Sequence, residues 1–201
     1  THRTHFLDGG VFHVEHQFHS TWLQTQRCLK QRNSLLREPK MDNRLLKSWT
    51  DELVTHSISL DTLRRGYFER FWPIFFNLME ELCKLEGLGI DFYSGWDIQQ
   101  DLTKILNERL SLDRKLGYTH SGPHRADLRV KIKGLPAADI LSRGQQKLVV
   151  AALKLAQASF LAKHTQKKSV FLVDDLPAEL DEGFQRAICS ILERENCQVF
   201  I

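Results

Sequence analysis

Apolar residues recur every three or four positions through much of the first half of the chain, a pattern that predicts long amphipathic helices. The first of these helices is expected from residue 14 to residue 37, with Pro39 shortly after its end. Residues 1–12 contain Gly9-Gly10 and are predicted to form a turn.

A second helical region is expected to begin at Asp42 or Asn43, because either side chain can cap a helix N-terminus. The apolar stripe of this region shifts by one residue near Gly66, so a break or bend is predicted there. Pro73 is a second place where the helix could kink. Together, the helical regions predict a helical hairpin or short antiparallel arm.

The second half of the chain mixes strand and helix patterns. Residues 90–96 predict a strand, and residues 97–116 predict a helix that ends at Gly117. Residues 118–127 are polar, contain a Gly-Pro pair and predict a loop. Residues 128–132 alternate between apolar and basic side chains, which predicts a strand with one basic face.

Residues 170–173 are Val-Phe-Leu-Val, and Asp174 and Asp175 follow them directly. An apolar run without polar alternation predicts a strand buried on both faces of a parallel sheet. Open α/β sheets bind ligands at the carboxyl ends of their strands, so one of these carboxylates could hold Mg²⁺ and its neighbour could orient or deprotonate a water. The same pair could instead cap the next turn.

The segment Leu141-Ser142-Arg143-Gly144-Gln145 precedes a helix that is expected to run to about Lys163. Ser142 is placed to cap this helix, and Gly144 leaves room for a ligand to approach the backbone. Free N–H groups at such a helix start can bind phosphate. A capped core helix would have a similar sequence, so this segment alone does not identify a phosphate site. Its position about 30 residues before the strand at 170–173 and the two aspartates is the more specific signal.

Composition sets wide limits on function. The chain is 42% hydrophobic and 26% charged, with a net charge of +3, as in ordinary soluble globular proteins. Its four cysteines form no C-x-x-C pair, which favours reduced cytoplasmic thiols over a disulfide framework or a zinc site. His13, His16 and His19 are spaced so that neighbours could share a metal, but partly exposed polar histidines fit as well. No apolar run reaches the length of a membrane span.

Positive charge concentrates around the end of the first predicted helix and the start of the second helical region. Between residues 27 and 47, seven basic residues stand against Glu38 and Asp42. This excess could contact phosphates, or it could be a solvated helix face. The seven residues are Arg27, Lys30, Arg32, Arg37, Lys40, Arg44 and Lys47. Arg129 and Lys131, on the basic face of the strand at 128–132, are two further candidates for phosphate contact.

Several of these stretches resemble motifs of one family. The segment at 141–145 is similar to the signature motif of ABC-type ATPases, residues 170–175 to their Walker B strand, and Glu179-Leu180-Asp181 to their D-loop. The RecF family is the closer match. Three more stretches resemble its motifs, namely Arg3-Thr4-His5-Phe6-Leu7-Asp8, Leu29-Lys30-Gln31-Arg32-Asn33 and Gly122-Pro123-His124-Arg125-Ala126-Asp127-Leu128.

The resemblance implies residue roles. In ABC-type heads, ATP binds between two subunits, so the signature residues Ser142, Arg143, Gly144 and Gln145 would act on the nucleotide of the other subunit, with Gln145 supporting the helix start. Asp174 would hold Mg²⁺ through water. Asp175 would be the catalytic base, and Asp181 would signal across the dimer.

The resemblance also implies a biological role, that of a cytoplasmic DNA repair and recombination ATPase. Such a protein would form an ATP-dependent homodimer on gapped DNA or at single-strand/double-strand junctions, and with RecO and RecR it would promote RecA loading. The basic residues at 27–47, with Arg129 and Lys131, are the candidates for DNA contact.

The fold class expected is an α/β ABC-type ATPase head, represented by its C-terminal part at 116–201, with a helical arm or lobe at 1–115. No G-x-x-x-x-G-K-[ST] phosphate loop occurs in the 201 residues. The chain therefore resembles a RecF protein without its N-terminal ATP-binding part, and the 201 residues alone are expected to be nearly inactive. The alternatives are another SMC-like or ABC-class head, or a non-catalytic interaction module.

Overall fold

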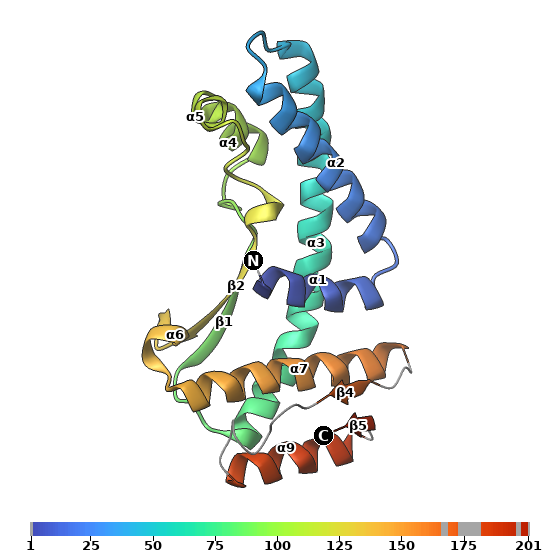
Figure 1. The fold of residues 1–201 in the computed structure, drawn as a ribbon, viewed down its shortest axis with the longest axis vertical. Helices are drawn as coiled ribbons and strands as arrows, with labels where there is room; N and C mark the ends of the chain where they lie inside the picture. Colours follow the sequence, from blue (N-terminus) through green and yellow to red (C-terminus); the bar gives the residue numbers. More distant parts are fainter. Residues whose placement is uncertain (1, 166–168, 173–181, 196–197, 201) are drawn as a thin grey trace. The chain divides into compact units, whose positions relative to one another are not determined.

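The computed structural model describes residues 2–165, 169–172, 182–195 and 198–200 (Figure 1). By its internal contacts the chain divides into two compact units. Unit 1 comprises Thr1–Gly66 and Phe92–Leu128, and unit 2 comprises Tyr67–Asp91 and Arg129–Ile201. The chain passes from one unit to the other three times, so these units differ from the division at residues 115 and 116, which stays a prediction.

Unit 1 is mainly helical. It contains α1 (His2–Val14), α2 (Phe18–Arg37), the first part of α3 (Asn43–Leu82), α4 (Leu102–Glu108) and α5 (Leu110–Leu116). One group of buried residues, most of them from α2, α3 and α4, forms an apolar core cluster in this unit. The group consists of Cys28, Leu29, Leu53, Trp96, Leu102, Ile105 and Leu106.

The turn predicted for residues 1–12 is wrong, because α1 occupies this stretch. Leu7 and Val11, one helical turn apart, are both fully buried. Burial of large apolar side chains contributes roughly 1.5–3 kcal/mol each, which exceeds the cost of about 1 kcal/mol for each glycine in a helix. Tertiary packing therefore overrides the local signal of Gly9-Gly10.

The helix break predicted near Gly66 is also wrong, because α3 runs through this residue as one helix of 40 residues. The alternative, a bend at Gly66, stays a prediction. The helix begins as predicted, since Asp42 Oδ1 accepts hydrogen bonds from the N–H groups of Arg44 and Leu45. Pro73 lies inside the helix. The C-terminal part of α3 carries a buried aromatic stripe of Tyr67, Phe71 and Phe75.

The single helix predicted at 97–116 is instead two short helices, α4 and α5, that meet at Arg109. Asp101 caps α4 by accepting hydrogen bonds from the N–H groups of Thr103 and Lys104, so the helix begins five residues later than predicted. The C-terminus is as predicted, with Gly117 in the left-handed region at φ 75°.

Three strands form one sheet in the order β1 (Leu88–Tyr93), β2 (Asp127–Ile132) and β3 (Leu135–Pro136), with β2 and β3 antiparallel. The strands predicted at 90–96 and 128–132 are therefore confirmed with small shifts in their bounds. The turn η1 (Pro123–Arg125) lies in the loop before β2.

The rest of unit 2 contains α6 (Ala137–Ile140), α7 (Arg143–Thr165), β4 (Val170–Leu172), α9 (Glu182–Arg194) and β5 (Gln198–Phe200). α7 confirms the long helix predicted after Ser142. Its apolar face is buried as expected, through Leu148, Ala152, Leu155, Ala156 and Phe160.

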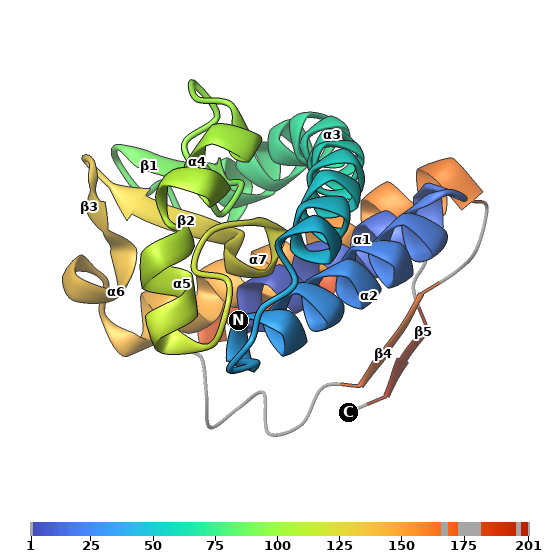
Figure 2. The same cartoon turned by 90° about the horizontal axis from the view of Figure 1, so that it is seen from above.

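β4 and β5 pair in parallel, with Phe171 opposite Val199 (Figure 2). The parallel pairing agrees with the sequence prediction, but the predicted burial on both faces does not hold. Val170 is 56% exposed and Leu172 is 81% exposed. Strand burial requires neighbours on both faces, and the described residues do not supply them. None of the described helices is long and apolar enough to cross a membrane.

Candidate functional site

The N-terminus of α7 carries the signature-like residues. Gln145 N–H donates to Ser142 Oγ over 3.3 Å, and Ser142 N–H donates to Gln145 Oε1 over 3.0 Å. This reciprocal pair is a capping box, which satisfies two backbone donors that a helix start would leave free. Gln146 Nε2 donates to the carbonyls of Ala138 and Leu141 and so ties the helix start to the segment before it.

The capping box leaves the outer surface of this helix start open. Ser142, Arg143 and Gly144 are exposed, and a Cβ at Gly144 would meet no atom within 4 Å. The remaining free N–H groups and the positive end of the helix dipole face outward at this point. The arrangement can therefore bind an anion such as a phosphate. Gln145, held in the capping box, supports the helix start.

The predicted metal residue, catalytic base and D-loop residue follow β4 in the sequence. Asp174, Asp175 and Asp181 lie outside the described residues. β4, which leads toward the first two of them, is described only through Leu172. Their predicted roles therefore stay predictions.

Arg32 is the centre of a buried polar network in unit 1. Its side chain is 1% exposed and forms an ion pair of 2.8 Å with Asp113, which is fully buried. The Arg32 guanidinium also donates to the hydroxyls of Thr50 and Thr119. Asp113 Oδ1 in turn accepts from the N–H of His120 over 3.0 Å. A guanidinium enclosed in this way cannot contact DNA, so the predicted role of Arg32 in DNA contact is wrong.

The periodicity of α2 carries a signal for this burial. Arg32 lies three residues after Leu29 and four before Leu36, in line with the apolar stripe. An arginine on a buried stripe requires an anionic partner. The partner, Asp113, lies 81 residues away in the sequence, and no local pattern indicates it.

A second buried arginine connects two of the family-like motifs. Arg64 donates to both carboxylate oxygens of Asp8 over 2.8 Å and to the carbonyl of Pro123 over 2.9 Å. Thr4 Oγ1 donates to the carbonyl of Ala126. The stretch at residues 3–8 is therefore fixed to the loop at 122–127. No local sequence pattern predicts this association.

His124 completes this loop. Its Nε2–H donates to the carbonyl of Thr119 over 2.9 Å, while Nδ1 is buried and has no hydrogen-bond partner among the described residues. Burial lowers the pKa of His124 below its usual value of 6.5, and the nearby Arg125 charge adds to this shift. Asn33 Oδ1 accepts from the N–H and hydroxyl of Thr119, so α2 is fixed to the same loop. The three family-like stretches thus meet around residues 117–127.

The other basic residues of the 27–47 region are exposed: Arg27, Lys30, Arg37, Lys40, Arg44 and Lys47. Some of them have partners within the protein. Arg37 Nε donates to the carbonyl of Gly117 over 2.9 Å, and Lys47 lies 3.3 Å from Asp51. The Arg27 guanidinium lies 5.7 Å from the centre of the Trp49 ring. Exposed lysines and arginines with such weak partners can still contact phosphates.

In unit 2, Arg129 and Lys131 lie on β2. Arg129 is exposed, and Lys131 Nζ lies 2.6 Å from the carboxylate of Asp91 on β1. The basic face of this strand is therefore partly neutralised within the sheet. Among the described residues, no group of three or more His, Cys, Asp or Glu side chains could hold a metal ion, and His13, His16 and His19 form none.

Comparison with curated proteins relates the chain to RecF. It is 47% identical over 199 residues to the DNA replication and repair protein RecF of Pseudomonas syringae pathovar tomato, and 48% identical over 199 residues to that of Pseudomonas fluorescens Pf-5. Each match covers 99% of the chain and 54% of the relative, so the chain spans about half the length of these relatives. No protein-family model matches the chain.

Solved structures give the same relationship. A structure of the recombination mediator protein RecF-ATP in the RecFOR pathway matches with a TM-score of 0.86 and 27% identity. A second, of RecF-ATPrS in the same pathway, matches with a TM-score of 0.86 and 26% identity. Both matches cover 100% of the chain and 56% of the solved chain. The resemblance to RecF and the expected ATPase-type α/β fold are confirmed.

Proposed function

We propose that this chain, which resembles about half of a RecF protein in sequence and fold, belongs to an ATP-dependent DNA-binding ATPase of recombinational repair. The observation that carries the proposal is the exposed, capped start of α7, where Ser142 and Gly144 lie at the positive end of a 23-residue helix. The similarity to solved RecF structures with ATP supports this assignment.

In the proposed mechanism, two copies of the intact protein enclose ATP between them. Ser142 would donate its hydroxyl, and Gly144 its backbone N–H, to the γ-phosphate bound by the other subunit. Arg143, exposed beside them, would add positive charge. ATP supplies the phosphoryl group, and these groups of the chain would stabilise its negative charge.

Carboxylate oxygens are the ligands that Mg²⁺ prefers, so the Asp174 carboxylate that follows β4 suits a magnesium site. Asp175 would accept a proton from the attacking water. An aspartate reaches less far than a glutamate would, which fits slow hydrolysis that acts as a switch. Asp181 would connect the two sites of the dimer.

The trans arrangement is testable by mixing variants of the intact protein. Ser142→Asp keeps a side chain that caps helices but places a carboxylate against the γ-phosphate. Asp175→Asn removes the proposed base. Each variant alone should hydrolyse ATP at least about tenfold more slowly than the wild type in single-turnover assays. Ser142→Thr, which keeps the hydroxyl, is the matched control.

Mixing the two defective variants should restore hydrolysis, because each mixed dimer contains one site with an intact Ser142 from one subunit and an intact Asp175 from the other. Recovery toward a quarter of the wild-type rate is expected from random pairing. If mixing restores nothing although mixed dimers form, the two residues do not serve one shared site, and the proposed mechanism fails.

The DNA-contact role falls to the exposed basic residues of 27–47, and the expected substrates are gapped DNA and single-strand/double-strand junctions. RecO and RecR would act with the protein to load RecA. Charge reversal at Lys30, Lys40 and Arg44 should weaken DNA binding by the intact protein and reduce the salt slope by about 0.9 for each phosphate that is no longer neutralised. Reversal at Lys84, Lys154 and Lys163, three exposed lysines of unit 2, is the control with the same change in net charge. Equal effects in both sets would show that the 27–47 region is a solvated face.

A further inference from the structure

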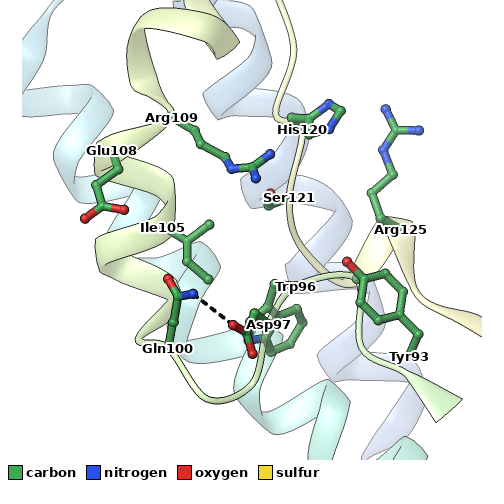
Figure 3. A pocket seen from close by; sticks show the side chains of 11 residues that line it. Tyr93, Trp96, Asp97, Gln100, Ile105, Glu108, Arg109, His120, Ser121 and Arg125 are labelled. Carbon is green, nitrogen blue, oxygen red and sulfur yellow. Dashed lines mark hydrogen bonds between the residues drawn. The ribbon is translucent and has the colours of Figure 1, made fainter. Parts of the chain in front are cut away.

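A pocket in unit 1 has no role in the proposed ATPase mechanism. Its volume is about 440 Å³, within the range of small-molecule sites. Residues from the end of β1, from α4 and its junction with α5, and from the loop before β2 line it (Figure 3).

One side of the pocket is suited to an anion. Figure 3 shows the Arg109 guanidinium pointing toward Ser121 and His120, while Glu108 points away from them. Arg125 also lines the pocket, and its guanidinium lies 5.6 Å from the centre of the Tyr118 ring, a contact that orients it. Two guanidinium groups and a serine hydroxyl are the donors that phosphate prefers.

The opposite side of the pocket combines apolar side chains with a polar pair, an amide and a carboxylate. Trp96 and Ile105 are buried and form its base, and the Tyr93 ring lies at its edge. Gln100 Nε2 donates to Asp97 over 2.8 Å, so this amide and carboxylate are held together at the wall. An aromatic ring with neighbouring amide and carboxylate groups suits a nucleobase, which offers both a flat face and exocyclic amines.

The backbone around the pocket is firmly fixed. Gly122 N–H donates to the carbonyl of Gly95 over 3.1 Å, and a Cβ on Gly95, at φ 96°, would overlap Gly122. The N–H of His120 is held by Asp113, itself paired with Arg32. The two loops that carry the lining side chains are therefore held by contacts within the protein, and such preorganisation lowers the entropy cost of binding.

From this arrangement we propose that the pocket binds one nucleoside phosphate unit, with its phosphate on Arg109 and Arg125 and its base against Tyr93. The unit could be an unpaired nucleotide of a DNA strand or a free nucleotide, since both present the same groups. A base inside a duplex is stacked and paired and cannot enter. The DNA source rests on the proposed DNA-binding function, and the pocket would then recognise its single-stranded part.

The test compares Arg109→Ala/Arg125→Ala with wild type in the intact protein, using four probes: single-stranded (dT)20, a blunt 20-bp duplex, free dTMP and inorganic phosphate. For a DNA source, the double variant should bind (dT)20 at least about tenfold more weakly, with duplex binding unchanged. Arg109→Lys/Arg125→Lys should recover part of the loss, because charge remains while the fork of N–H groups is removed. Lys104→Ala, on the same helix but outside the lining, is the matched control and should leave all four affinities unchanged.

Photocrosslinking gives a second readout that does not depend on affinity. An oligonucleotide with 5-iododeoxyuridine should crosslink to Tyr93 in the wild type and much less in the double variant. Loss of dTMP binding with unchanged (dT)20 binding would assign the pocket to free nucleotides. If (dT)20 and dTMP bind the double variant as tightly as the wild type and no crosslink forms at Tyr93, the proposal is overturned. In that event, intact duplex binding and ATP hydrolysis would show that the proposed function itself stands.

Discussion

The ion pair between Arg32 and Asp113 gives the sharpest prediction for stability. Replacing Asp113 with alanine would leave a guanidinium that is 1% exposed without its anionic partner, and the N–H of His120 without its acceptor. Removing one partner of a buried ion pair typically costs about 3–5 kcal/mol, because the remaining charge stays desolvated. The variant is therefore expected to lose much of the stability of unit 1.

Hydrogen–deuterium exchange measures this loss where it arises. In the intact wild-type protein, the N–H groups of Thr119 and His120 donate to side chains of Asn33 and Asp113 and should exchange slowly. In Asp113→Ala, a peptide covering residues 118–122 should exchange more than about a hundredfold faster, as a cost of about 3–5 kcal/mol implies. Urea unfolding should show the same loss as a lower midpoint.

Lys47→Ala is the matched control, because Lys47 forms an exposed ion pair with Asp51 on the same unit. Exposed pairs contribute about 0–1 kcal/mol, so this variant should keep the wild-type exchange rates and midpoint. If Asp113→Ala were as stable as Lys47→Ala, the enclosed network around Arg32 would not support unit 1.

Two further predictions concern the loop around residues 117–127. Gly95→Ala should destabilise the intact protein by several kcal/mol, since its Cβ would overlap Gly122 and its φ of 96° disfavours alanine, whereas Gly9→Ala, with no atom within 4 Å, should be neutral or stabilising in thermal unfolding. The lowered pKa of His124 means that the unfolded chain takes up a proton first, so stability should fall as pH drops below about 6.5. His124→Gln, whose amide can still donate to Thr119, should remove this part of the acid loss in urea titrations at pH 7 and pH 5; an unchanged difference between the two pH values would contradict it.

Local sequence patterns determined the features whose partners are close in the chain. The partners in the capping box, Ser142 and Gln145, lie three positions apart, and the Asp42 cap acts on the next helical turn. The buried apolar face of α7 and the helix end at Gly117, which has a left-handed backbone, are likewise predicted from residues a few positions apart. In each case, the hydrogen-bond partners or packing neighbours lie within one or two helical turns along the chain. The order of residues is therefore enough to predict the feature.

Tertiary structure decided the features that depend on distant partners. In the sequence, Arg32 is one of seven basic residues between residues 27 and 47. In the structure it is buried and paired with Asp113, which lies 81 residues away in the chain. α1 forms across Gly9-Gly10 because burial of Leu7 and Val11 outweighs local propensity. The pocket around Arg109 exists because three separate segments meet there. Burial of apolar side chains and pairing of buried charges change the free energy of folding by more than local helix preferences do. The periodicity of a sequence does not indicate which distant surfaces pack against each other.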